Sequence, residues 1–132
     1  MPQNNKLTSP RIKVVQKIYG SIINPDAEIE YPKSQYKKFI KDIVTGTLER
    51  RELIEEKINQ YLSEDLNLNR TDKLLKIIIF AAIFELLFKH KNPTKVIINE
   101  YLKTSEFFLE KNQTKYLNAI LDKISKKIRN EN

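Results

Sequence analysis

The amino-acid sequence predicts an all-α protein, and three observations support that prediction. Glycine occurs only twice in 132 residues. The extended segments lack the alternation of apolar and polar residues that is typical of strands. Most of the chain carries apolar residues three and four positions apart, which is the repeat of one helix face. We therefore expect a compact bundle of about six to seven helices.

The first helix is predicted from Ser9 to Gly20. Ser9 suits the N-cap and Pro10 suits the first helical position, where the missing N–H costs nothing. One apolar stripe follows at helical spacing, formed by Ile12, Val15, Ile18 and Tyr19. Pro25 and Pro32 then interrupt the pattern and predict a connecting loop.

Helical spacing resumes after Ser34, which can cap the next stretch. The apolar face of this stretch consists of Tyr36, Phe39, Ile40, Ile43, Val44, Leu48, Ile54, Ile58 and Tyr61. Gly46 interrupts the stretch, and two interpretations of this glycine remain open. It either divides two helices or allows another element to pack closely.

The most apolar helix is predicted over residues 74–88, after a cap at Asn69 or Thr71. Only Lys76 and Glu85 are charged within it. A helix that is apolar nearly all the way round is normally surrounded by other elements. We expect this helix to form the centre of the core.

Two more helices complete the prediction. The first opens at Pro93 or Thr94, and a turn is expected at Asn112 and Gln113. The last helix has the most regular spacing, with one apolar side formed by Leu117, Ile120, Leu121, Ile124 and Ile128. No internal repeat accompanies these elements.

Composition limits the class of protein. A chain of 132 residues has room for one domain, and we expect a single domain over residues 1–132 with flexible ends at residues 1–8 and 130–132. Without cysteine, the chain cannot form a thiolate metal site. A Ser-His-Asp site would have to use His90, the one histidine, which lies in a polar stretch and is expected to be a surface residue. We expect no metal, no cofactor and no enzymatic activity.

Charge and hydropathy bear on partners and location. The net charge of +7 attracts polyanions such as nucleic acid, although a lysine-rich composition bias would produce the same excess. The longest uncharged apolar run, residues 77–84, is far shorter than the roughly 20 residues that cross a bilayer. The first residues do not resemble a signal peptide. We expect a cytoplasmic protein.

Three polar positions interrupt apolar runs where core residues would be expected. Glu85 lies near the end of the most apolar helix, Asn99 follows residues 96–98, and Asn118 precedes residues 119–121. A buried polar group without a partner costs roughly 1–3 kcal/mol. We expect the two asparagines to be satisfied by backbone groups, with either a structural or a functional role open to them.

Three blocks of sequence carry more specific information: IFEL at residues 83–86, PTKVIINE at 93–100 and KYLNAILDK at 115–123. In this order they resemble the C-terminal pattern of the NusB family of transcription antitermination factors. The family forms are an aromatic-Glu-Leu, PxKVxINE and KFVNGVLDK. Upstream, QKIY at residues 16–19 is similar to the family's QALY.

The resemblance implies a fold of two small helical subdomains packed together and no cofactor. It also implies binding to the boxA element of RNA from ribosomal RNA operons, together with the ribosomal protein NusE, within an RNA polymerase antitermination complex. Family members include monomers and dimers, so a homodimer is open. Two other functions are also open: an RNA-binding module related to those of ribosomal RNA cytosine methyltransferases, and a homo-oligomeric interaction module.

The resemblance also implies roles for individual residues. Arg11 matches an arginine expected to contact RNA phosphate, and Tyr116 matches an aromatic residue that could stack on a base. The other residues expected along the RNA path are lysines, namely Lys13, Lys17, Lys89, Lys91 and Lys115. Tyr19 and Glu85 match positions that face NusE.

Two positions depart from the family pattern. Consecutive arginines precede the first helix in many members, whereas this chain has Leu7, Thr8 and Ser9. Ala119 replaces the glycine of the family's VNG, a small-for-small change that keeps close packing and favours helix.

Overall fold

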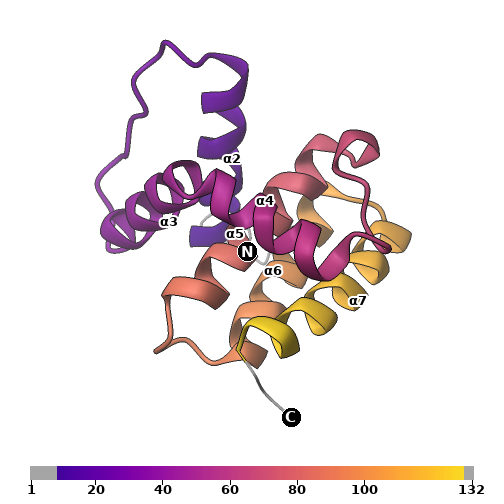
Figure 1. Cartoon of the computed structure of the whole chain (residues 1–132). Helices are drawn as coiled ribbons and strands as arrows, with labels where there is room; N and C mark the ends of the chain where they lie inside the picture. The colour runs from indigo at the N-terminus through magenta and orange to yellow at the C-terminus, as the bar shows by residue number, and fades with distance from the viewer. Residues whose placement is uncertain (1–8, 130–132) are drawn as a thin grey trace.

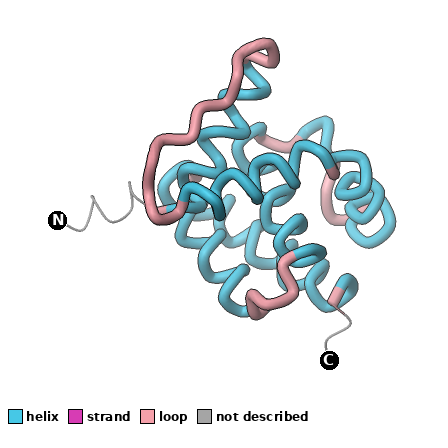
Figure 2. The backbone as a smooth tube through the Cα atoms, turned by 90° about the vertical axis from the view of Figure 1, so that its left-hand side faces the viewer, coloured by secondary structure: helices cyan, strands magenta, loops and turns pink. Residues whose placement is uncertain are grey.

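The computed structural model describes residues 9–129, and the ends expected to be flexible lie outside this range. The described residues contain six α-helices, one short 3-10 helix and no strand (Figure 2). The all-α prediction and the predicted number of helices are therefore confirmed. None of the helices in residues 9–129 is long and apolar enough to cross a membrane.

The bounds of the helices are α2 (Pro10–Ile23), α3 (Lys37–Glu49), α4 (Arg51–Leu62), η1 (Leu68–Arg70), α5 (Lys73–Phe88), α6 (Thr94–Phe108) and α7 (Lys111–Ile128). Short turns join the helices, except for two longer connections, one between α2 and α3 and one between α4 and α5 (Figure 1). Residues 24–36 form the long connection between α2 and α3, and they extend away from the body of the molecule.

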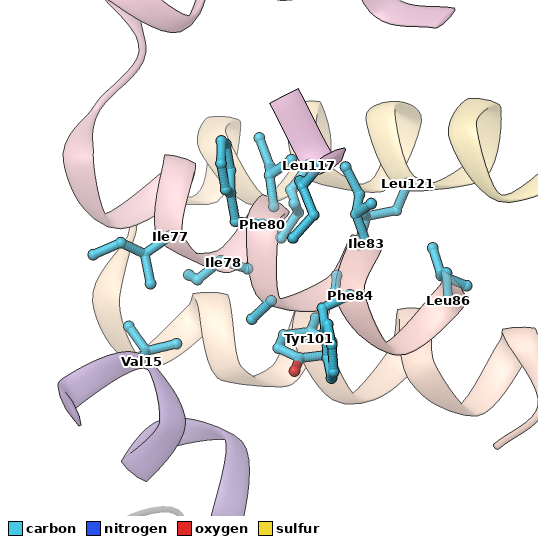
Figure 3. Packing of buried hydrophobic residues seen from close by; sticks show 14 of the residues in the cluster. Val15, Ile77, Ile78, Phe80, Ile83, Phe84, Leu86, Tyr101, Leu117 and Leu121 are labelled. Carbon is cyan, nitrogen blue, oxygen red and sulfur yellow. The ribbon is translucent and has the colours of Figure 1, made fainter. Parts of the chain in front are cut away.

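Helix α5 lies at the centre of the core, as its composition predicts. Every residue from Ile77 to Leu86 is buried. Figure 3 shows Leu117 and Leu121 of α7 on one side of α5 and Tyr101 of α6 on the other. Each fully buried Leu or Ile side chain contributes about 1.5–3 kcal/mol of transfer free energy. Surrounding α5 on all sides therefore stabilises the whole arrangement.

The other helices pack on α5 in two groups. Helices α6 and α7 pack on α5 and on each other, while α2 and α3 pair with each other and also contact α5. A single cluster of buried apolar residues runs through both groups and includes residues of α4. This agrees with the expected fold of two small subdomains packed together, joined by one continuous core.

The two interpretations of Gly46 are resolved in favour of close packing. Helix α3 continues through Gly46 to Glu49, and the break before α4 falls at Arg50. A Cβ atom at Gly46 would lie 2.1 Å from Cζ of Phe84. The Phe84 ring of α5 therefore occupies the space that any larger residue would need.

Several helix ends differ from the predictions. Helix α2 continues past Gly20 to Ile23, and α3 starts at Lys37. Asp72, rather than Asn69 or Thr71, caps α5 by accepting a hydrogen bond from the Leu75 amide. These differences are small because the caps lie within a few polar residues of one another, and only tertiary packing selects among them.

The turn predicted at Asn112 and Gln113 is wrong, because both residues lie in the first turn of α7. Glu110 is the N-cap of α7. Its side chain accepts from the backbone of Gln113, and the Gln113 side chain accepts from the Glu110 amide in return. This reciprocal arrangement is a capping box, which satisfies amides that the helix itself leaves free. Polar residues that suggested a turn therefore start a helix.

Asn99 and Asn118 are exposed, contrary to the expectation that they are embedded in the core. Each follows a core-facing or partly buried residue by one position, as Asn118 follows the buried Leu117. One step along an α-helix turns the side chain by about 100°. The asparagines therefore point away from α5. Because their side chains are exposed, their amide groups need no hydrogen-bond partner within the protein.

Arg129 joins the end of α7 to the end of α5. Its guanidinium donates to the backbone oxygens of Leu86 at 2.8 Å, Lys89 at 3.0 Å and Asn92 at 2.7 Å. The last carbonyls of a helix have no partner within it and carry partial negative charge, so a cation there is favourable. Arg129 therefore fixes the turn between α5 and α6.

Candidate RNA-binding and partner-binding surfaces

Arg11 and Glu85 form a buried ion pair between α2 and α5. Arg11 Nε donates to Glu85 Oε2 at 2.9 Å, and Arg11 Nη2 donates to Glu85 Oε1 at 2.7 Å. Arg11 is 8% exposed and Glu85 is fully buried. Such a bidentate pair fixes both side chains in one geometry. It therefore positions the start of α2 on the core helix.

Further groups complete this buried cluster. The Tyr101 hydroxyl donates to Glu85 Oε2, and Asn92 Nδ2 donates to Glu85 Oε1 at 3.3 Å. The Arg11 guanidinium lies 5.0 Å from the ring centroid of Phe39 and 5.4 Å from that of Tyr101. Both oxygens of Glu85 are thus bonded, and helices α2, α3, α5 and α6 meet around one ion pair.

The cluster shifts two pKa values. Burial alone would lower the pKa of Arg11, but the hydrogen bond and the charge of Glu85 outweigh burial and raise it. Burial raises the pKa of Tyr101 well above its ordinary value, and the neighbouring Glu85 raises it further. Arg11 is thus held charged and Tyr101 neutral, which suits a structural cluster.

This geometry disagrees with the surface roles expected for Arg11 and Glu85. The resemblance implied that Arg11 contacts phosphate and that Glu85 faces a protein partner. In the structure the two residues bind each other, and Glu85 has no accessible surface. The sequence could not show this, because 74 positions separate them. We therefore interpret both as residues that position α2.

The lysines of α2 remain accessible. Lys13 is exposed and Lys17 is half-buried, while their neighbours Val14, Val15 and Ile18 are buried. The helix thus presents two ammonium groups one turn apart on its outer side. Neither lysine forms an ion pair with another residue of the described range 9–129.

Tyr116 and Lys115 lie near the start of α7, and both are exposed. The Tyr116 hydroxyl donates to the backbone oxygen of Asp65, and Lys123 Nζ donates to the Asp65 carboxylate at 2.6 Å. Tyr116 is 39% exposed, so part of its ring is accessible while its hydroxyl is fixed. Burial, followed by the charge of Asp65, raises the pKa of Tyr116.

Lys89 and Lys91 lie in the turn after α5. Lys89 is half-buried, and its Nζ lies 3.8 Å from Asp42 Oδ2 of α3. Lys91 is exposed, as is His90 between them. This turn is held by Arg129, which follows Tyr116 by 13 positions in the sequence, so the two places lie about 20 Å apart along α7.

The end of α2 presents apolar side chains. Tyr19, Ile22 and Ile23 are exposed, at 39%, 40% and 56%. Ile22 also lines a cavity of about 370 Å³. The apolar lining of that cavity is completed by Ile18, Leu48, Leu68, Ile77 and Phe80. Neighbouring exposed apolar residues commonly mark a protein-binding surface, and Ile22 and Ile23 were not anticipated from the sequence.

The predicted site residues therefore occupy separate places. Lys13, Lys17 and Tyr19 share α2, while Lys89 and Lys91 lie in the turn after α5. Lys115 and Tyr116 lie beside Asp65. Within residues 9–129, no group of three or more His, Cys, Asp or Glu side chains is arranged to hold a metal ion.

Comparison with known proteins identifies the family. The sequence profile of the NusB family matches residues 6–126, which is most of the chain. The chain belongs to the NusB family. Transcription antitermination protein NusB of Bartonella tribocorum is 29% identical over 95% of this chain and 91% of its own length. The protein of the same name from Mesorhizobium japonicum is 34% identical over 71% of this chain and 61% of its own length.

A solved structure supports the same assignment. NusB of T. maritima superposes with a TM-score of 0.75 at 25% identity, and the alignment covers 89% of each chain. The arrangement of helices around α5 is thus the NusB fold. The resemblance found in the sequence blocks is confirmed. The relatives from both bacteria bear the name transcription antitermination protein.

Proposed function

We propose that this protein is an RNA-binding transcription antitermination factor that binds boxA-type RNA of ribosomal RNA operons together with NusE. The observation that carries the proposal is the match of the NusB family over residues 6–126. Relatives from two bacteria bear the name transcription antitermination protein. The protein would act within an RNA polymerase antitermination complex and would need no cofactor.

Exposed lysines and one tyrosine support RNA binding. Lys13 and Lys17 on α2 can neutralise phosphates, and the accessible part of the Tyr116 ring can stack on an unpaired base. Lys115 adjoins Tyr116, and Lys91 is exposed in the turn after α5. Lys89 is the weakest candidate because it is half-buried and already lies near Asp42.

The exposed apolar end of α2 supports binding of a protein partner. Tyr19, Ile22 and Ile23 lie together at the end of this helix, and burying them against NusE would be favourable. In this proposal Arg11 and Glu85 contribute indirectly. Their ion pair holds α2 on α5, so the position of Tyr19 depends on a contact that the partner never touches.

The proposal is tested by measuring binding of a labelled boxA-type RNA across salt concentrations, with and without NusE. The wild-type protein should bind, and NusE should strengthen binding. Tyr116→Leu should weaken RNA binding roughly tenfold, because stacking contributes about 1–3 kcal/mol per base. Tyr19→Ala should abolish the strengthening by NusE and leave binding of RNA alone unchanged.

Two results would contradict the proposal. Absence of any boxA preference over a scrambled RNA of equal length would remove the RNA assignment. Unchanged NusE binding by Tyr19→Ala and by Ile23→Asp would remove the partner surface.

Light scattering of the free protein tests the homodimer, which would appear as twice the monomer mass of 15.6 kDa.

A further inference from the structure

A basic groove lies between α2, the connection at residues 24–36, and the start of α3. Its volume is about 780 Å³. The basic residues that line it are Lys13, Lys17, Lys33 and Lys37, and two tyrosines, Tyr31 and Tyr36, also line it. No acidic residue lines the groove. Figure 1 shows the connection that forms its outer wall, extending away from α2 before it returns to α3.

The four lysines are available to an anion. None of them forms an ion pair with another residue in the described range 9–129. Lys13, Lys33 and Lys37 are exposed, and Lys17 is half-buried. Four unpaired ammonium groups around one groove repel one another, and this repulsion falls when a polyanion binds.

The two tyrosines have different roles. Tyr31 is half-buried and packs against the core, so it anchors the connection. Tyr36 is 43% exposed. Its amide donates to Ser34 Oγ at 3.2 Å, and the Lys37 amide donates to the Ser34 carbonyl at 3.2 Å. Local turns thus hold Tyr36 in place with its ring accessible.

The groove has a defined boundary. A neighbouring hollow shares Gln16 and Lys17 but is also lined by Glu28 and Glu30. These carboxylates would repel phosphates. An RNA strand in the groove would therefore be directed along the side of the lysines and away from the tip of the connection.

We infer that this groove binds a segment of single-stranded RNA, with its phosphates on Lys13, Lys33 and Lys37 and one base stacked on Tyr36. Lysine-lined grooves with an accessible aromatic ring are the usual means of binding single strands. This inference rests on the proposed function and adds a site to it.

The test compares two pairs of lysines that carry the same charge. Lys33→Gln/Lys37→Gln removes two groove lysines, and Lys38→Gln/Lys41→Gln removes two exposed lysines that do not line the groove. The probe is a labelled single-stranded RNA that carries a boxA-type element with flanking nucleotides on both sides. The groove pair should lower the slope of log affinity against log salt by about 1.4, since each phosphate contact contributes roughly 0.7. The control pair should lower it much less.

Stacking is tested at Tyr36. Tyr36→Leu should weaken binding of the same RNA about tenfold, while Tyr36→Phe keeps the ring and should bind like the wild type. Tyr36→Trp would introduce the chain's one tryptophan, whose fluorescence reports stacking directly. RNA should quench this fluorescence, and a poly-glutamate peptide should not. Thermal unfolding should be alike for all these variants, because residue 36 is exposed.

The outcomes separate this inference from the proposed function. If the wild type binds boxA-type RNA but both lysine pairs reduce the salt slope equally, the groove site is wrong and the proposed function stands. Lack of quenching in Tyr36→Trp would also overturn the groove site. If poly-glutamate binds and quenches as RNA does, the groove is a site for acidic peptides. If the wild type binds no RNA, both proposals fall.

Discussion

Arg11 is a buried residue that positions helix α2, and the exposed side chains of α2 depend on that position. Its guanidinium is bound by both oxygens of Glu85 and lies over two aromatic rings. Taking a charge out of water is costly, so the pair is stable only while both partners are present. The residue therefore holds α2 in place, while its neighbour Lys13 remains exposed.

Removing one partner of this pair should destabilise the protein strongly. Arg11→Met leaves the buried Glu85 without its cation, and we expect the free energy of unfolding to fall by about 3–5 kcal/mol. Urea unfolding measures this change. Arg11→Met/Glu85→Gln removes both charges, so its loss should be smaller than that of Arg11→Met alone.

The same variants separate a structural Arg11 from a phosphate-binding one. If Arg11→Met leaves the unfolding free energy unchanged but lowers the salt slope of RNA binding by about 0.7, the surface role implied by the family pattern is right. The buried ion pair predicts the opposite result. Arg11→Met should lower the free energy of unfolding, and at a temperature where the variant is folded it should leave the salt slope of RNA binding unchanged.

At the scale of elements, the two glycines lie in helices but differ in the space around them. Nothing lies within 4 Å of a Cβ atom built on Gly20, whereas the Phe84 ring occupies that space at Gly46. Helix propensity favours alanine over glycine by about 1 kcal/mol at both positions. Only the packing of α3 against α5 distinguishes them.

We therefore predict opposite effects of alanine at the two positions. Gly20→Ala should raise the free energy of unfolding by about 0.5–1 kcal/mol. Gly46→Ala should lower it by about 1–3 kcal/mol, because overpacking a core forces side chains and backbone to shift. Thermal or urea unfolding measures both. Adding Phe84→Leu to Gly46→Ala should make the alanine less harmful, and no such coupling would contradict the close contact.

At the scale of the whole molecule, one buried cluster joins four helices and makes the free energy of unfolding depend on pH in the alkaline range. Tyr101 is fully buried, and its pKa is raised well above 10.0. In the unfolded chain this phenol ionises near its ordinary value of about 10. Folding therefore favours the protonated form. Its contribution is complete below pH 10 and is lost as the pH rises through the folded pKa.

The free energy of unfolding should accordingly fall above about pH 10, by up to roughly 1.4 kcal/mol per pH unit for this group. Tyr101→Phe should be less stable at neutral pH, since Glu85 loses a hydrogen bond. It should also show a shallower decline above pH 10. Chemical unfolding between pH 7 and 11 measures both effects, with the exposed Tyr36→Phe as control. Identical alkaline slopes in wild type and Tyr101→Phe would contradict this assignment.

Much of the fold was predictable because it depends on local pattern. The apolar spacing of residues 117–128 and the nearly uncharged run around residues 77–84 identified α7 and the central α5. The mixed polar stretch at Asn112 and Gln113 misled, because a capping box and a turn use the same residue types. The exposed positions of Asn99 and Asn118 depended on rotation about each helix, which a count of apolar neighbours does not give.

The sequence by itself determined the all-α class, the central helix and the NusB family, because helical periodicity and ordered motif blocks are properties of neighbouring residues. Tertiary structure decided which charged residues are accessible. Arg11 and Glu85 lie 74 positions apart and meet only when α2 packs on α5. The groove of Lys13, Lys33 and Lys37 likewise exists only after residues 24–36 fold back toward α3. The burial of a side chain and the charges near it depend on contacts between distant segments of the chain. The sequence therefore identified the candidate site residues, and the packing showed which of them position a helix and which are accessible.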